Sequence, residues 1–72
     1  MILEITYDQE EDGRWIARIE SLCGVSQYGN TKEEATRNVK IVALQALKWM
    51  LEDGELENLD TISFKVTEAI AV

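Results

Sequence analysis

Residues 29–54, GNTKEEATRNVKIVALQALKWMLEDG, contain the start, the apolar stripe and the end of one long helix. Thr31 precedes Glu34 by three residues, the spacing of a capping box, in which the two side chains satisfy backbone N–H groups at a helix start. Gly54 supplies the positive φ that commonly follows a helix end. Between them, apolar residues recur every three or four positions and predict a face that lies on a sheet: Ala35, Val39, Val42, Ala43, Ala46, Trp49 and Met50. The stretch therefore predicts a helix over about residues 32–53.

Four extended segments are expected around this helix. Residues 2–7 alternate between apolar and polar, and residues 14–21 do so again after an acidic turn that ends in Asp-Gly. Residues 25–28 form a short third segment, and residues 61–67 form a fourth, whose alternation continues through Ile70 and Val72. The order β-β-β-α-β predicts an α+β fold of two layers, a mainly antiparallel sheet packed on one long helix. The 72 residues are expected to form one domain, 1–72.

Charge and composition indicate which class of partner and which cellular compartment to expect. The chain has 7 Lys and Arg against 14 Asp and Glu, a net charge of -7, so it repels phosphate backbones and anionic lipid. Direct binding to nucleic acid or to a membrane is therefore not expected, whereas a basic protein would be attracted. Cys23 is the only cysteine, and Met1-Ile-Leu is followed at once by Glu4. These features predict a cytoplasmic protein without disulfides.

Few residues suit catalysis. The chain has no His, so the commonest general base and metal ligand is absent, and Cys23 has no His to activate it. The glycines form no phosphate-binding motif. The segment Asp8–Gly13 has the oxygen ligands of half a calcium loop, but Ile19 stands where a bidentate Glu is required. We therefore expect a protein that is not an enzyme and that has no metal or other cofactor.

A second row of apolar residues on the helix is not expected to be covered by the sheet. Leu44, Leu47 and Leu51 are expected beside the core-facing stripe, with Ile41 further round the helix. A chain of this length has a small core, so covering the row in an oligomer would add stability. The row predicts a homo-oligomer, most simply a dimer. A toxin-like partner and the C-terminal tail are the other covers that the sequence leaves open.

Residues 2–50 resemble the HicB-like antitoxin family. The resemblance is carried by the alternating first strand into Asp8, the acidic turn closing at Gly13, the strand start Trp15-Ile-Ala17, then Leu22 and Gly24, and the run Gly29-x-Thr31-x-Glu33-Glu34-Ala35. The resemblance implies a domain with a truncated RNase H-like fold that binds and masks a toxin. The toxin is a small basic ribonuclease whose fold is like that of double-stranded-RNA-binding domains. Many members add a C-terminal DNA-binding segment. Only six residues follow Val66 here, so operator binding is expected to be lost or delegated to another chain. The family usually has Pro where this chain has Glu20 and Cys23.

The residues and the resemblance together predict a protein–protein interaction domain. Its expected contact surface is the acidic hairpin with neighbouring aromatic residues: Asp8, Glu10, Glu11, Asp12, Trp15 and Tyr28. The carboxylates would steer a basic partner, and the aromatic residues would slow its dissociation. Two other hypotheses are a stand-alone oligomeric domain of this type, with a regulatory or scaffolding role and no toxin, and a residual metal-dependent phosphodiesterase.

Overall fold

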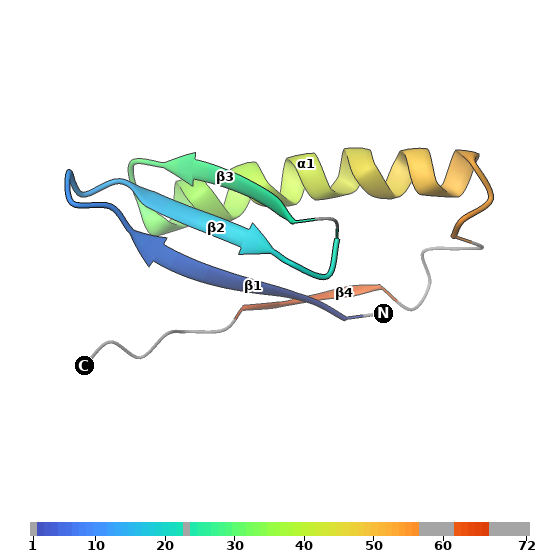
Figure 1. Cartoon of the computed structure of the whole chain (residues 1–72), viewed down its shortest axis with the longest axis horizontal. Helices are drawn as coiled ribbons and strands as arrows, with labels where there is room; N and C mark the ends of the chain where they lie inside the picture. Colours follow the sequence, from blue (N-terminus) through green and yellow to red (C-terminus); the bar gives the residue numbers. More distant parts are fainter. Residues whose placement is uncertain (1, 23, 57–61, 67–72) are drawn as a thin grey trace.

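The structure, a computed structural model, describes residues 2–22, 24–56 and 62–66. One four-stranded sheet packs against one long helix (Figure 1). The elements in chain order are β1 (Ile2–Gln9), β2 (Trp15–Ile19), β3 (Val25–Gly29), α1 (Lys32–Glu52) and β4 (Ser63–Val66). The predicted β-β-β-α-β arrangement is confirmed.

The strands lie in the order β3-β2-β1-β4. β1 pairs with β2, and β2 with β3, in antiparallel fashion, whereas β4 runs parallel to β1, so the sheet is mainly antiparallel. The second strand is shorter than the predicted segment 14–21, because the chain turns at its end: the N–H of Leu22 donates to the carbonyl of Ile19 at 3.3 Å. The predicted ends of the fourth segment, at 61 and 67, and its continuation through Ile70 and Val72 lie outside the described residues.

The core lies between α1 and the sheet, and α1 packs chiefly against β3 and β2. Leu3, Ile5 and Tyr7 all point toward the helix, as their alternation predicts. The buried cluster consists of Leu3, Ile5, Tyr7, Ala17, Ile19, Leu22, Ala35, Val39, Ala43 and Leu47. Because the helix sits over β2 and β3, the helix-side surface of β1 and β4 borders a more open region.

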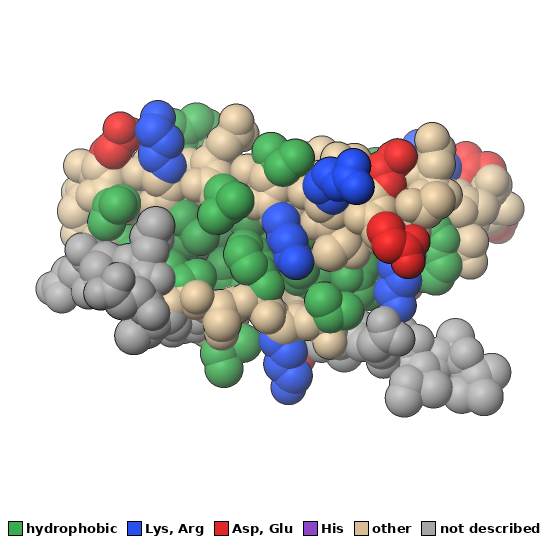
Figure 2. Space-filling view, turned by 180° about the vertical axis from the view of Figure 1, so that it is seen from behind, with side chains coloured by type: hydrophobic (Ala, Val, Ile, Leu, Met, Phe, Trp, Pro, Cys, Tyr) green, Lys and Arg blue, Asp and Glu red, His purple; other side chains and the backbone are tan. Residues whose placement is uncertain are grey.

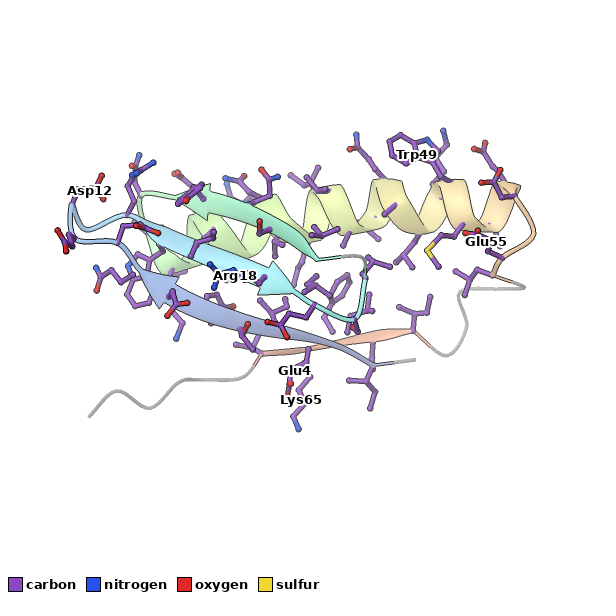
Figure 3. The ribbon with its side chains drawn as sticks, viewed as in Figure 1. Glu4, Asp12, Arg18, Trp49, Glu55 and Lys65 are labelled. Carbon is purple, nitrogen blue, oxygen red and sulfur yellow. The ribbon has the colours of Figure 1, made fainter. Side chains whose placement is uncertain are left out.

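Two predictions about α1 are wrong. The sequence places Leu47 on the uncovered row, but it is only 1% exposed and belongs to the core. The sequence places Trp49 in the core, but it is 59% exposed and points away from the sheet (Figure 3). The reason is that the buried row of α1 repeats every four residues, through Ala35, Val39 and Ala43. Leu47 continues that row, whereas a residue six positions after Ala43 lies on the far side of the helix.

The helix start confirms the predicted cap. Thr31 has an extended backbone, and its Oγ1 accepts a hydrogen bond from the N–H of Glu34 at 3.0 Å. The carboxylate of Glu34 accepts from the N–H of Asn30 at 3.0 Å, one residue before the donor that a capping box normally uses. At the other end, Gly54 follows the helix with a φ of 79°, a value that side chains disfavour.

Gly29 has a different role, set by the space around it. It is buried at the end of β3, and a Cβ on it would lie 2.3 Å from the backbone N and 2.8 Å from the Cα of Ala35. Only a residue without a side chain allows the first turn of α1 to pass so close to the strand. The Gly and the Ala of the run Gly29-x-Thr31-x-Glu33-Glu34-Ala35 thus meet at one backbone crossing.

Candidate functional site

The acidic hairpin joins β1 to β2 at one end of the molecule. The N–H of Gly13 donates to the carbonyl of Glu10 at 2.9 Å, and the N–H of Glu10 donates to the carbonyl of Arg14 at 2.7 Å. These bonds close the turn and leave Glu11 and Asp12 exposed at its tip. The hairpin therefore presents carboxylates on an ordered support.

Two of the four hairpin carboxylates are held by arginines of the same hairpin. The Nε of Arg14 lies 2.8 Å from Oδ2 of Asp12, and Nη1 of Arg18 lies 2.7 Å from Oδ2 of Asp8. Within the described residues, the other two carboxylates form no ion pair. Four carboxylates against two guanidinium groups leave the hairpin negative. The local field is thus weaker than the sequence suggests, but its sign is the predicted one.

Asp12 is held in its ionised form. Its pKa lies below the ordinary value of 3.8, first because the backbone N–H of Arg14 donates to the carboxylate and second because the guanidinium of Arg14 also donates to it. The carboxylate therefore keeps its charge under more acidic conditions than a free aspartate does.

The two aromatic residues of the predicted surface lie on opposite faces of the sheet. Trp15 is opposite Gly29 and packs against the core on the helix side. Tyr28 is opposite Ile16, points to the other face and is 47% exposed, with the guanidinium of Arg14 at 4.8 Å from its ring centre. Tyr28 and the carboxylates can therefore share one contact surface, whereas a half-buried Trp15 can reach it only from the side.

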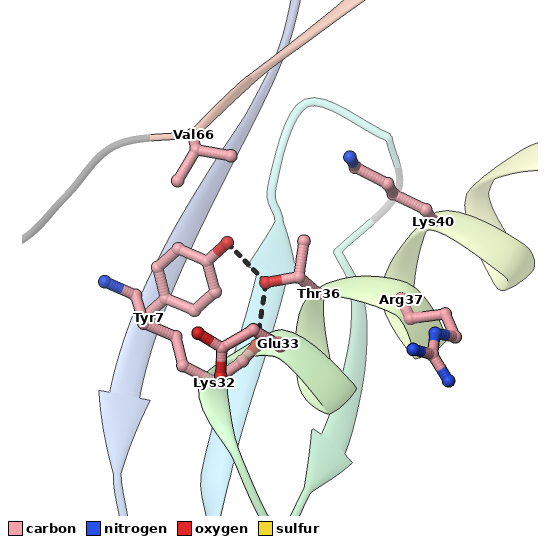
Figure 4. Close-up of a pocket in the computed structure, with 7 residues that line it drawn as sticks. All are labelled: Tyr7, Lys32, Glu33, Thr36, Arg37, Lys40 and Val66. Atoms are coloured by element: carbon pink, nitrogen blue, oxygen red, sulfur yellow. Dashed lines mark hydrogen bonds between the residues drawn. The ribbon is translucent and has the colours of Figure 1, made fainter.

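A second site lies on the helix side, where the first turns of α1 face β1 and β4 (Figure 4). It is an open groove of about 460 Å³, here called the cationic groove. Its lining consists of Tyr7, Lys32, Glu33, Thr36, Arg37, Lys40 and Val66. Hydrophobic side chains with Lys and Arg side chains beside them run across this face of the molecule in Figure 2.

Hydrogen bonds fix the floor of the cationic groove. Thr36 Oγ1 donates to the carbonyl of Lys32 at 2.8 Å, so its single proton is used, and the hydroxyl of Tyr7 donates to the same Oγ1 at 2.6 Å. This chain of hydrogen bonds ties the first turns of α1 to β1.

The lining of the cationic groove carries three cations and one carboxylate, although the whole chain is strongly acidic. Two of the cations also contact aromatic rings: Nζ of Lys32 is 4.7 Å from the ring centre of Tyr7, and Nζ of Lys40 is 5.5 Å from that of Phe64. Sequence reasoning missed this site because it used the net charge. The signal was present in the clustering of Lys32, Arg37 and Lys40 within the first half of the helix.

The predicted apolar row survives without Leu47. Ile41, Leu44 and Leu51 are 51%, 54% and 40% exposed. Together with Lys48 they have the spacing three, four, three, which places them along one flank of α1. We call these four residues the exposed seam.

No group of three or more metal-ligating residues exists within the described ranges, and no helix there is both long and apolar enough to cross a membrane. Comparisons of the chain with protein-family models, with curated proteins and with solved structures found no match. The likeness to HicB-like antitoxins therefore rests on the residues quoted above.

Proposed function

We propose that this chain is a non-enzymatic protein–protein interaction domain of the HicB-like antitoxin type, acting in the cytoplasm. Its partner is a small basic protein, such as a ribonuclease toxin, which it masks by binding. The observation that carries the proposal is the acidic hairpin, where a closed turn carries four carboxylates and Arg14 joins Asp12 to the exposed ring of Tyr28.

The hairpin residues have different roles in the proposed binding. Glu10 and Glu11 form no ion pair with the described residues and supply the attraction that steers a basic partner. Asp12 is oriented by Arg14, which also lies over Tyr28, so this part of the surface is already arranged before a partner arrives. Charges at an interface rim act mainly on the association rate, and burial of the aromatic ring would slow dissociation.

A second candidate function is a stand-alone oligomeric domain with a regulatory or scaffolding role and no toxin partner. The specific observation that favours it is the exposed seam, because apolar side chains in a row on one helix flank are typical of an interface. An oligomer formed through the exposed seam is compatible with partner binding at the hairpin, because the two surfaces consist of different residues.

The test combines identification of a partner with kinetics. The tagged full chain is recovered from its native host, bound proteins are identified by mass spectrometry, and the partner is then purified. Glu10→Gln with Glu11→Gln is expected to slow association several-fold at low salt and much less at high salt, because salt screens exposed charges. The matched control, Glu20→Gln with Asp53→Asn, removes the same charge from exposed positions away from the tip and should slow association much less. An acidic partner, or equal effects of the two double variants, would refute the mechanism.

A further inference from the structure

The two edges of the sheet differ in what covers them. β3 forms one edge, where α1 packs against the strand and the side-chain amide of Asn38 donates to the carbonyl of Tyr28 at 2.9 Å. β4 forms the other edge, and its only hydrogen-bonded neighbour among the described strands is β1. Along the part of the chain that the structure describes, the outer row of backbone N–H and C=O groups of β4 is therefore open to a further strand.

The cationic groove lies beside β4 on the helix side of the sheet. Phe64 pairs with Leu3 of the core, so Phe64 and, two residues later, Val66 point to the helix side. Val66 is 42% exposed, because α1 sits over β2 and β3 instead of β4. Lys40 extends from α1 toward this strand (Figure 4), and its Nζ is 5.5 Å from the ring centre of Phe64. The helix therefore holds a cation above the apolar side chains of β4.

The charge of the cationic groove favours an acidic ligand. Arg37 and Lys40 form no ion pair with the described residues. Glu33 is the one carboxylate in the described lining of the groove. Two cations against one carboxylate leave the groove positive even when Lys32 is left out of the count. A Glu side chain of a ligand fits such a groove, because its methylene groups would pack on Val66 while its carboxylate met the cations.

We propose that the outer edge of β4 binds an extended acidic segment of a partner protein as a fifth strand, with carboxylates of that segment facing Arg37 and Lys40. An added strand gains affinity from its backbone hydrogen bonds and specificity from its alternating side chains. Paired strands lie about 4.8 Å apart, so every second side chain of the segment would stand beside Phe64 and within reach of the ammonium group of Lys40. This inference goes beyond the proposed function, since the acidic segment and the basic partner bind to different surfaces.

The first experiment measures binding of a short fluorescent peptide of alternating Glu and Val to the full chain by anisotropy at physiological salt. Arg37→Gln with Lys40→Gln should weaken binding about fivefold, because two charge contacts are lost. The matched control, Arg18→Gln with Lys48→Gln, removes the same charge outside the groove and should weaken binding much less. Circular dichroism checks that both double variants fold. No binding to the wild type, or equal weakening by the two double variants, would overturn the inference.

The second experiment separates strand addition from binding of carboxylates alone. The same peptide with every backbone nitrogen methylated has no N–H to donate and should bind at least about tenfold more weakly. Equal binding of the methylated peptide, or its displacement by an equal concentration of glutarate, would show that a backbone is not required and would refute the proposal.

Two further measurements identify other occupants of the edge. Sedimentation that showed a dimer whose formation displaces the peptide would assign the edge to a second copy of the chain. Binding that appeared only after removal of residues 67–72 would assign it to the chain itself. Either result would refute this inference and leave the proposed role of the hairpin untouched.

Discussion

Replacing Gly29 with Ala tests the close backbone approach between β3 and the first turn of α1. The backbone φ of Gly29 is not positive, so an Ala is free to adopt it, and the whole penalty comes from the added methyl group. That methyl would lie 2.3 Å from the N of Ala35, whereas ordinary contact begins near 3.4 Å, so the first turn of α1 has to move by the difference of 1.1 Å. The neighbouring atoms belong to the backbone, which has no rotamer to change.

The magnitude follows from two opposing effects. Overpacking costs about 1–3 kcal/mol, and contact with backbone atoms belongs at the upper end of that range. Ala also restricts the unfolded chain, which offsets about 0.4–1 kcal/mol. Gly29→Ala should therefore lower the free energy of unfolding by about 2 kcal/mol, equivalent to a fall in Tm of about 10 °C for a domain of this size.

The control makes the same chemical change where space is open. Gly54 has a φ of 79°, and a methyl group added to it would meet nothing within 4 Å, so Gly54→Ala carries only the backbone penalty of about 1 kcal/mol. Urea denaturation followed by circular dichroism measures both variants. If Gly29→Ala is no more destabilising than Gly54→Ala, the close approach to Ala35 is not the reason for a glycine at position 29.

Four further predictions follow from individual contacts. Thr31→Ala removes the helix cap and should cost about 1 kcal/mol in urea denaturation; an unchanged midpoint would contradict the role of its hydroxyl. Tyr7→Phe removes the hydrogen bond to Thr36 and should cost about 1 kcal/mol, with no loss expected if water replaces the partner. Asp12 should titrate below 3.8 by NMR; because its folded pKa is lowered, its stabilising effect is present above the ordinary pKa and is lost as pH falls through the folded one. RNA incubated with the pure protein and Mg²⁺ or Mn²⁺ should remain intact, and cleavage abolished by Asp8→Asn would refute the non-enzymatic proposal.

The elements of this fold were predictable because local signals agree with one another. Alternation along β1, the cap at Thr31 and the break at Gly54 each act within a few residues, and the structure has all three where the sequence predicts them. Gly29 shows the limit of such signals. Its place in the sequence suggests a turn, whereas its role depends on a helix crossing that only the folded chain reveals.

The burial of single helix residues was harder to predict, because a helix stripe several residues wide fits more than one rotation. Leu44 and Leu47 are equally apolar, and the choice of which one faces the sheet depends on where α1 lies relative to β2 and β3. An error of that kind also placed Trp49 in the core. Trp15 and Tyr28 were predicted to share one contact surface, but they lie on opposite faces of the sheet. They belong to adjacent antiparallel strands, and their opposite directions depend on a register that pairs Trp15 with Gly29.

In the proposed function, the local charge of each surface, more than the net charge of the chain, decides where a basic partner binds. At physiological salt, charges act over about 8 Å, which is short beside the 40 Å length of the molecule. A basic partner therefore does not respond to the net charge of -7 as a whole. Near the cationic groove it meets Arg37 and Lys40 and is repelled, whereas near the hairpin it meets excess carboxylate and is attracted. At about 0.01 M salt the screening length approaches 30 Å, and the charges of the two regions act together. Association is then faster, but the orientation of the encounter is less selective. Salt should thus slow the encounter of the proposed basic partner while sharpening its choice of surface.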